Sequence, residues 1–238
     1  MKKLINVMLL VTILLVIVAP CVQAYPYTVT LDVNSYSYLP GGEFTLTPVT
    51  GGLESVLSNY ASTTSGGTNF ETFCIETRVN FTPKSWGGPT YYAGISDSAL
   101  GGNITNGGDN PLTLGAAWLY YEFATGQLQG FDYSTGSNSN RRITSGELQE
   151  AIWILMGQDH DNASLDQGNI FLAEAFSQLG TSETQASNGS YGVHVLNLYN
   201  ADGSPAQNQL VLTPEPTTML LFGLGLVGLA GVRRKFEK

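Results

Sequence analysis

The chemistry that this sequence offers centres on one cysteine. Of the two cysteines in the 238 residues, Cys21 falls in an N-terminal segment that we predict to be cleaved, which leaves Cys74 as the single thiol. Exported proteins normally pair their cysteines in disulfides, so a lone thiol needs an explanation. It can be a buried inert side chain, a catalytic nucleophile, or a group consumed in another covalent bond.

The residues around Cys74 alternate and predict a strand over residues 70–81. Apolar side chains at positions 73, 75, 79 and 81 share one face of this strand. Cys74 lies on the opposite face, between Thr72 and Glu76, because side chains alternate with a period of two. We therefore expect Cys74 to lie outside the apolar core, which argues against an inert buried cysteine.

A catalytic cysteine needs a base within hydrogen-bond reach, and the chain has two histidines. His160 lies in a polar loop between Asp159 and Asp161, and His194 lies in a predicted strand between two valines. Neither is in a recognisable catalytic motif, and each is readily explained as a surface or strand histidine. The sequence therefore predicts that the protein is not an enzyme, and a cysteine hydrolase is the less favoured alternative.

A covalently consumed thiol needs an electrophilic partner, and Gln149 is the candidate. It lies in a predicted helix, where a period of 3.6 residues stacks it with Trp153 and Met156 beside an apolar stripe. Glu147 and Glu150 are expected on the polar side. A glutamine at the edge of an apolar stripe is either a packed amide with backbone partners or a reacting group.

Two short motifs resemble the thioester domains of bacterial surface adhesins. The strand motif is Phe73-Cys74-Ile75-Glu76, and the helix motif is Leu148-Gln149-Glu150-Ala151-Ile152-Trp153. The resemblance implies that the Cys74 sulfur attacks the Gln149 side-chain amide and forms an internal thioester, which a surface amine then opens to leave an isopeptide bond. By its position, Trp153 would shield the thioester from water.

Metal and nucleic-acid chemistry find little support. Asp159, Asp161 and Asp166 cluster around a loop, but Ala163 and Ser164 break the spacing of a calcium loop, and a solvated acidic loop explains the cluster. We expect no metal and no cofactor. Between residues 25 and 216 the chain carries four basic and eighteen acidic residues, a net charge of −14, which excludes a nucleic-acid-binding surface.

The elements predict an α+β fold, a single domain over residues 25–213 in which strands flank a block of three helices. Strands are expected where Val29, Leu31 and Val33 alternate with polar residues, at Phe44 and Leu46, and at 191–199 and 209–213. The turn at 40–42, Pro-Gly-Gly, separates the first two.

Capping signals place the three helices. The first should begin with Asn110 as N-cap and Pro111 as its first residue, and it should bury one face, with Leu114, Ala117, Trp118 and Tyr121. The second should begin at the capping box of Thr144 and Glu147. The third should end at Gly180 and bury a stripe of Leu172, Ala175, Phe176 and Leu179.

The N-terminal segment, residues 1–24, has the pattern of a secretory signal peptide. Lys2 and Lys3 precede an apolar run that Pro20 interrupts, and small residues stand at Val22 and Ala24 before the expected signal peptidase cut. A lipid-modified Cys21 is the alternative, but Pro20 precedes it where a small residue is expected.

The C-terminal segment, residues 214–238, has three parts in order. They are the triplet Pro214-Glu215-Pro216, a charge-free run of 16 residues with four glycines over 217–232, and the basic cluster Arg233-Arg234-Lys235. At about 1.5 Å per residue the run spans ~24 Å, enough to cross a thinned bilayer with the basic cluster as a cytoplasmic stop. The arrangement resembles the PEP-CTERM sorting domain of Gram-negative, exopolysaccharide-producing bacteria. That resemblance implies recognition by exosortase, cleavage near the triplet, and delivery to the cell surface or matrix.

Together these observations predict an exported, membrane-anchored protein that forms a Cys74–Gln149 thioester and attaches covalently to an amine-bearing surface or matrix partner. The alternative, from another class, is a noncovalent exopolysaccharide or biofilm-matrix structural protein with an inert Cys74.

Overall fold

The structure is a computed structural model that describes residues 25–38, 41–53, 69–103, 105–136, 139–158 and 168–213. Several predictions fall on residues outside these ranges. They are the signal peptide at 1–24, the sorting triplet, apolar run and basic stop at 214–238, His160, and the three aspartates of the acidic loop. No helix in the described ranges is both long enough and apolar enough to cross a membrane.

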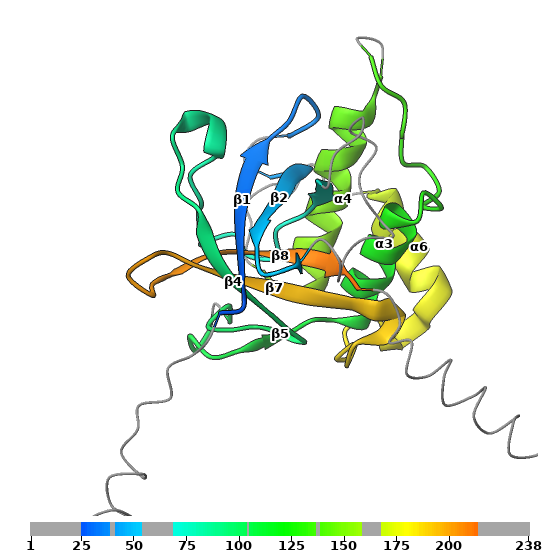
Figure 1. Cartoon of the computed structure of the whole chain (residues 1–238). Coiled ribbons are helices and arrows are strands. Elements are labelled where there is room, and N and C mark those ends of the chain that lie inside the picture. The colour runs from blue at the N-terminus through cyan, green and yellow to red at the C-terminus, as the bar shows by residue number, and fades with distance from the viewer. Residues whose placement is uncertain are drawn as a thin grey trace, which may run out of the picture.

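The described part of the chain folds around one strongly curved sheet of six strands with three helices gathered on one side of it (Figure 1). The strands are β1 (Tyr27–Val33), β2 (Phe44–Thr50), β3 (Phe70–Thr72), β4 (Tyr91–Ser96), β7 (Val193–Tyr199) and β8 (Pro205–Leu212), in the order β3-β2-β1-β4-β7-β8. Paired neighbours run antiparallel. A small second sheet joins β5 (Ser98–Ala99) to β6 (Asn110–Pro111).

The helices α3 (Leu114–Ala124), α4 (Arg141–Leu155) and α6 (Ile170–Leu179) lie between β6 and β7 in the chain. Short 3-10 turns are η1 (Lys84–Trp86), η2 (Gly180–Ser182) and η3 (Ser190–Gly192). The predicted α+β class, with strands on both sides of a three-helix block, is consistent with this arrangement.

The sheet closes on itself at one place. Beyond β3, the Leu210 N–H donates to the Phe73 carbonyl at 3.0 Å and the Ile75 N–H donates to the Asn208 carbonyl at 3.3 Å. An antiparallel bridge pairs Cys74 with Gln209 between these two bonds. The segment after β3 therefore pairs with β8, the opposite edge strand, and Cys74 lies at the junction.

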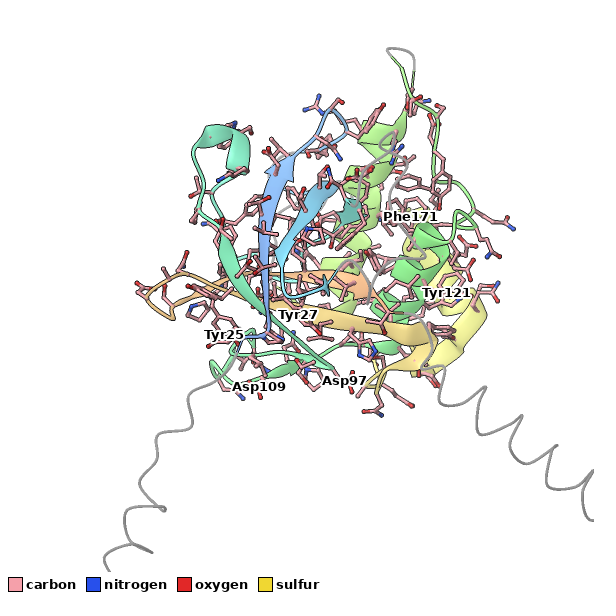
Figure 2. The ribbon with its side chains drawn as sticks, viewed as in Figure 1. Tyr25, Tyr27, Asp97, Asp109, Tyr121 and Phe171 are labelled. Carbon is pink, nitrogen blue, oxygen red and sulfur yellow. The ribbon has the colours of Figure 1, made fainter. Side chains whose placement is uncertain are left out.

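Closure gives the sheet two buried faces. The inner cluster lines one face and consists of Val29, Leu31, Phe44, Leu46, Leu53, Phe70, Cys74, Tyr91, Ala93, Trp153, Leu196, Leu198, Ala206 and Val211. The helix-side cluster joins the other face to α3, α4 and α6, and its sheet residues include Phe73, Ile75, Val193, Val195, Leu210 and Leu212. Figure 2 labels one of its helical members, Phe171, among the three helices.

The predicted exposure of Cys74 is wrong, and two buried faces explain why. Phe73 and Ile75 do share a face, but Cys74 on the other face is 0% exposed and packs in the inner cluster. The alternation separates one core from another rather than core from solvent. The predicted strand over 70–81 is also shorter than expected, since β3 ends at Thr72.

The helix starts differ from prediction as well. Asn110 and Pro111 form β6, and α3 begins at Leu114 with Thr113 as N-cap, whose hydroxyl accepts the Ala116 N–H. Helix α4 begins at Arg141, three residues before the predicted Thr144. The Thr144 hydroxyl instead donates to the Arg141 carbonyl at 3.2 Å, the ordinary interaction of a threonine inside a helix.

Three predicted faces are confirmed only in part: Ala117, Trp118 and Ala175 are buried as predicted, but other residues differ. Helix α3 is buried on most sides, since it packs against α4, α6, β7 and β8. Glu150, expected on the polar side of α4, is 2% exposed, whereas Phe176, expected in the core, is 53% exposed. Helix α6 does end before Gly180, as predicted.

Candidate functional site

Cys74 and Gln149 are in direct contact through three polar atom pairs. The Cys74 N–H donates to Gln149 Oε1 at 3.1 Å, Gln149 Nε2 donates to the Cys74 carbonyl at 2.6 Å, and Cys74 Sγ lies 3.3 Å from Oε1. The amide carbon lies one C=O bond, about 1.23 Å, from Oε1, so it is within about 4.5 Å of the sulfur. Thiol and amide are thus side by side and buried, with exposures of 0% and 1%.

Helix α4 presents Gln149 to Cys74 because of its period. Leu148, Ala151 and Ile152 belong to the helix-side cluster, whereas Trp153 belongs to the inner cluster. Gln149 and Trp153 are four residues apart and therefore lie on one stripe of the helix. That stripe faces the junction of the closed sheet, where Cys74 lies.

The segment that carries Cys74 is held on both sides. At one end, the Thr72 hydroxyl donates to the Leu210 carbonyl at 2.6 Å. At the other end, the Thr77 N–H donates to Gln158 Oε1 at 3.3 Å, so a second glutamine next to α4 binds the same segment. These bonds, together with those of Gln149, leave the Cys74 backbone little freedom to move.

Burial raises the pKa of the Cys74 thiol far above its ordinary value, and the nearby Glu76 carboxylate adds to the shift. The Trp153 indole N–H faces the sulfur and lowers the pKa of the thiol, which offsets part of this rise. Its geometry falls short of a full hydrogen bond, so Trp153 Nε1 is a buried donor with no partner in the described part of the chain. The thiol is therefore neutral, and this environment is unlike that of an activated thiolate.

Glu76 is a further residue of the site, and its burial was not predicted from the sequence. It is 3% exposed, and it accepts the Asn208 N–H at 2.8 Å and Asn208 Nδ2 at 3.1 Å. Burial raises its pKa from 4.5 to about 7, although the two Asn208 bonds lower it in part. Its position two residues after Cys74 in the strand motif was the available signal.

A third chain segment reaches the amide, and sequence reasoning treated it only as a turn. The Gly42 N–H points at Gln149 Oε1 from 3.4 Å. Next to it, a Cβ at Gly41 would lie 2.5 Å from Trp153 Cη2 and 2.6 Å from Gln149 Cγ. The two glycines let the backbone approach α4 more closely than a side chain permits.

The histidine reading gains no support from the described residues. His194 Nδ1 pairs with Asp97 Oδ1 at 2.7 Å, and Figure 2 labels Asp97 at the lower end of the view, below β7. Cys74 has its contacts with Gln149 and with the inner cluster instead. His160 and the acidic loop at 159–166 are not among the described residues. Among those that are, no three His, Cys, Asp or Glu side chains gather as metal ligands would.

The contact between Cys74 and Gln149 is compatible with a structural role and with a chemical role. The amide completes the hydrogen bonding of a buried backbone, which is a structural role. The same contact places a thiol beside an acyl carbon, which is the starting geometry for acyl transfer.

Comparison with known protein families gives a match at the C-terminal end of the chain. Residues 212–235 match the PEP-CTERM protein-sorting motif. The PEP-CTERM motif indicates exosortase-dependent sorting of an exported protein that passes through the membrane. The match covers most of the predicted sorting segment, 214–238. No curated protein and no solved structure matches the chain.

Proposed function

We propose that this PEP-CTERM protein forms an internal thioester between Cys74 and Gln149 and uses it to attach covalently to an amine on a surface or matrix partner. The observation that carries the proposal is the buried contact in which the Cys74 sulfur lies 3.3 Å from Gln149 Oε1. The strand and helix motifs that resemble adhesin thioester domains support it. The reaction consumes the acyl group once, so the protein is a reagent rather than an enzyme.

The chemistry has two balanced steps. In the first, the Cys74 sulfur bonds to the Gln149 side-chain carbon, the C–N bond breaks, and the amide nitrogen leaves as ammonia with the thiol proton. In the second, a partner amine bonds to the same carbon, the C–S bond breaks, and a proton from the amine restores the Cys74 thiol. Trp153 shields the thioester between the two steps, since it is 6% exposed and packs in the inner cluster.

The destination follows from the sorting motif. Signal peptidase removes residues 1–24, and the C-terminal segment holds the protein in the membrane by its apolar run and basic stop. Exosortase then acts near Pro214–Pro216 and delivers the domain to the cell surface or matrix of a Gram-negative bacterium. Between residues 25 and 216 the chain has one lysine, Lys84, which limits reaction of the protein with itself.

Intact mass spectrometry of the purified protein tests the thioester. We expect a mass lower than that of the sequence by one ammonia, and we expect this deficit to disappear in Cys74→Ala and in Gln149→Ala. Gln158→Ala is the matched control, because Gln158 is also buried and bonds the same segment, and it should keep the deficit. An unmodified mass in the wild-type protein would exclude the proposal.

One observation favours a second function, noncovalent binding of exopolysaccharide. A cavity of about 350 Å³ opens beside Trp86, which is 64% exposed. Its lining combines apolar and amide side chains: Val33, Phe44, Asn80, Phe81, Pro83, Trp86 and Gln207. Aromatic faces with a few amide groups suit the apolar and hydroxyl surfaces of a sugar ring.

Affinity electrophoresis through gels that contain soluble bacterial exopolysaccharides tests this second function. If the cavity binds sugar, the protein is retarded and Trp86→Ala removes the retardation. Phe176→Ala is the control, because Phe176 is an exposed aromatic residue on α6, away from the cavity lining. Equal retardation of the protein and Trp86→Ala would show that the cavity does not bind these polymers.

A further inference from the structure

Two backbone N–H groups converge on one oxygen at the candidate site. Gln149 Oε1 accepts the Cys74 N–H at 3.1 Å and faces the Gly42 N–H at 3.4 Å. The donors come from segments that are far apart in the sequence, since Gly42 is 107 residues from Gln149 and Cys74 is 75. An amide oxygen has two lone pairs, and here two backbone N–H groups from different segments approach it, which is the donor arrangement of an oxyanion site.

We propose that the Gly42 and Cys74 N–H groups form an oxyanion site for the acyl transfer at Gln149. This inference rests on the proposed thioester function. When the sulfur bonds to the Gln149 carbon, the electron pair of the C=O bond moves to Oε1, and the two N–H groups stabilise the resulting negative charge. The pair returns to re-form the C=O bond as ammonia leaves. The partner amine adds to the same carbon in the second step and generates the same oxyanion.

The Cys74 contact at 3.1 Å has the length of an oxyanion-site hydrogen bond, and the Gly42 contact at 3.4 Å is longer. Bonds from N–H to an anionic oxygen are shorter and stronger than bonds to a neutral one, so the 3.4 Å contact from Gly42 tightens as charge develops. In chymotrypsin-like serine proteases the backbone N–H of the nucleophile itself supplies one donor of this kind, as Cys74 does here.

The amide is held so that its oxygen cannot turn away from the donors. Gln149 Nε2 donates to the Cys74 carbonyl at 2.6 Å, which directs Oε1 to the opposite side. If the amide were rotated by half a turn, Nε2 would face the Cys74 N–H and Oε1 would face the Cys74 carbonyl. Two donors would then meet each other, and so would two acceptors. The oxygen is therefore oriented before the reaction begins, and such preorganisation is the source of oxyanion-site catalysis.

The Gly42 donor depends on a close approach that only glycine permits. Gly42 has φ +112°, where a Cβ would lie 2.6 Å from the Tyr38 nitrogen. A buried ion pair then fixes the segment to α4: Arg141 Nε donates to Glu43 Oε2 at 2.9 Å, and Arg141 Nη2 donates to Glu43 Oε1 at 2.5 Å. The Ser145 hydroxyl adds a bond of 3.1 Å to Glu43 Oε2.

A backbone ester at Gly42 removes the N–H donor without adding a side chain. A synthetic segment from Tyr25 to Phe73, with glycolic acid in place of Gly42, can be joined by native chemical ligation to a chain that begins at Cys74. The all-amide semisynthetic chain is the reference. The matched control carries the ester at Ser37, whose N–H donates to the Asn34 carbonyl at 3.3 Å, away from the amide.

Each chain is refolded in detergent, folding is checked by circular dichroism, and the loss of ammonia is followed by intact mass. We expect thioester formation to slow ~10²-fold in the Gly42 ester and to change little in the Ser37 ester. The infrared C=O stretch of the thioester should also rise in the Gly42 ester, because its carbonyl has lost a hydrogen bond.

The outcomes separate the two proposals. If the all-amide chain loses no ammonia, the thioester function fails and the oxyanion site with it. If that chain and the Gly42 ester form the thioester equally fast, or have the same C=O frequency, only the oxyanion site is overturned.

Should the ester chain not refold, Gly41→Ala in the full chain decides, since its Cβ would push Gly42 away from Gln149. We expect at least ~10-fold slower formation in that variant, and an unchanged rate would overturn the inference.

Discussion

Glu76 shows how one residue can set the response of this domain to pH. Its carboxyl group is buried, and burial raises its pKa from 4.5 to about 7. In the unfolded chain the same group titrates near its ordinary value. Between pH 4.5 and about 7, the folded protein therefore holds a proton that the unfolded chain has released.

This difference predicts the direction of the pH effect. Stability should fall as the pH rises from about 4.5 to about 7 and then level off, because the folded state binds more protons in that window. The contribution of Glu76 to the fall is about 3 kcal/mol. Denaturant unfolding at a series of pH values measures it, and Glu76→Gln should lose most of the slope. The same slope in that variant would mean that another group causes it.

At the scale of elements, the site depends on how the segment before β2 lies along α4. Arg141 and Glu43 are 2% and 0% exposed and form a two-point ion pair near the start of the helix. Further along, a Cβ at Gly146 would lie 2.7 Å from the Tyr38 ring, so backbone and ring are in close contact. The ion pair thus holds the segment that brings Gly42 to Gln149.

Removing one partner of this ion pair should be severe. Glu43→Ala removes the two-point carboxylate partner of the buried Arg141 guanidinium, and we expect a loss of about 3–5 kcal/mol in the free energy of unfolding. Replacing both residues by methionine should recover most of that loss, because apolar side chains of similar size can fill the site. Urea unfolding of the three proteins checks this. A double variant as unstable as Glu43→Ala would show that the ion pair has a larger role than filling the site.

At the scale of the whole molecule, the thioester would join two distant parts of the fold. Cys74 and Gln149 are 75 residues apart, and a covalent bond between them restricts the unfolded chain. We expect opening by methylamine to lower the free energy of unfolding by about 4 kcal/mol. Guanidinium unfolding before and after treatment measures the change. Cys74→Ala, which cannot form the bond, should be insensitive to methylamine, and an equal change in that variant would point to another cause.

Much of the architecture could be predicted from local pattern. The alternation of Val29 and Leu31 predicts β1, and both side chains are buried there. The end of α6 at Gly180 follows from the glycine C-cap. The helix starts were less predictable. Asn110 and Thr144 are residue types that favour the N-cap, but Asn110 lies in β6 and the Thr144 hydroxyl bonds to the Arg141 carbonyl within α4.

The sequence by itself determined the C-terminal sorting motif, the α+β class, and the choice of Cys74 and Gln149 as the residues to examine. Their thioester stays a prediction. Only the tertiary structure decided that Cys74 is buried, that Glu76 is buried near it, and that Gly42 reaches the same amide. These properties depend on closure of the sheet and on contacts across 75 and 107 residues. Local patterns report which residues share a face, but what covers that face is set by segments far away in the chain.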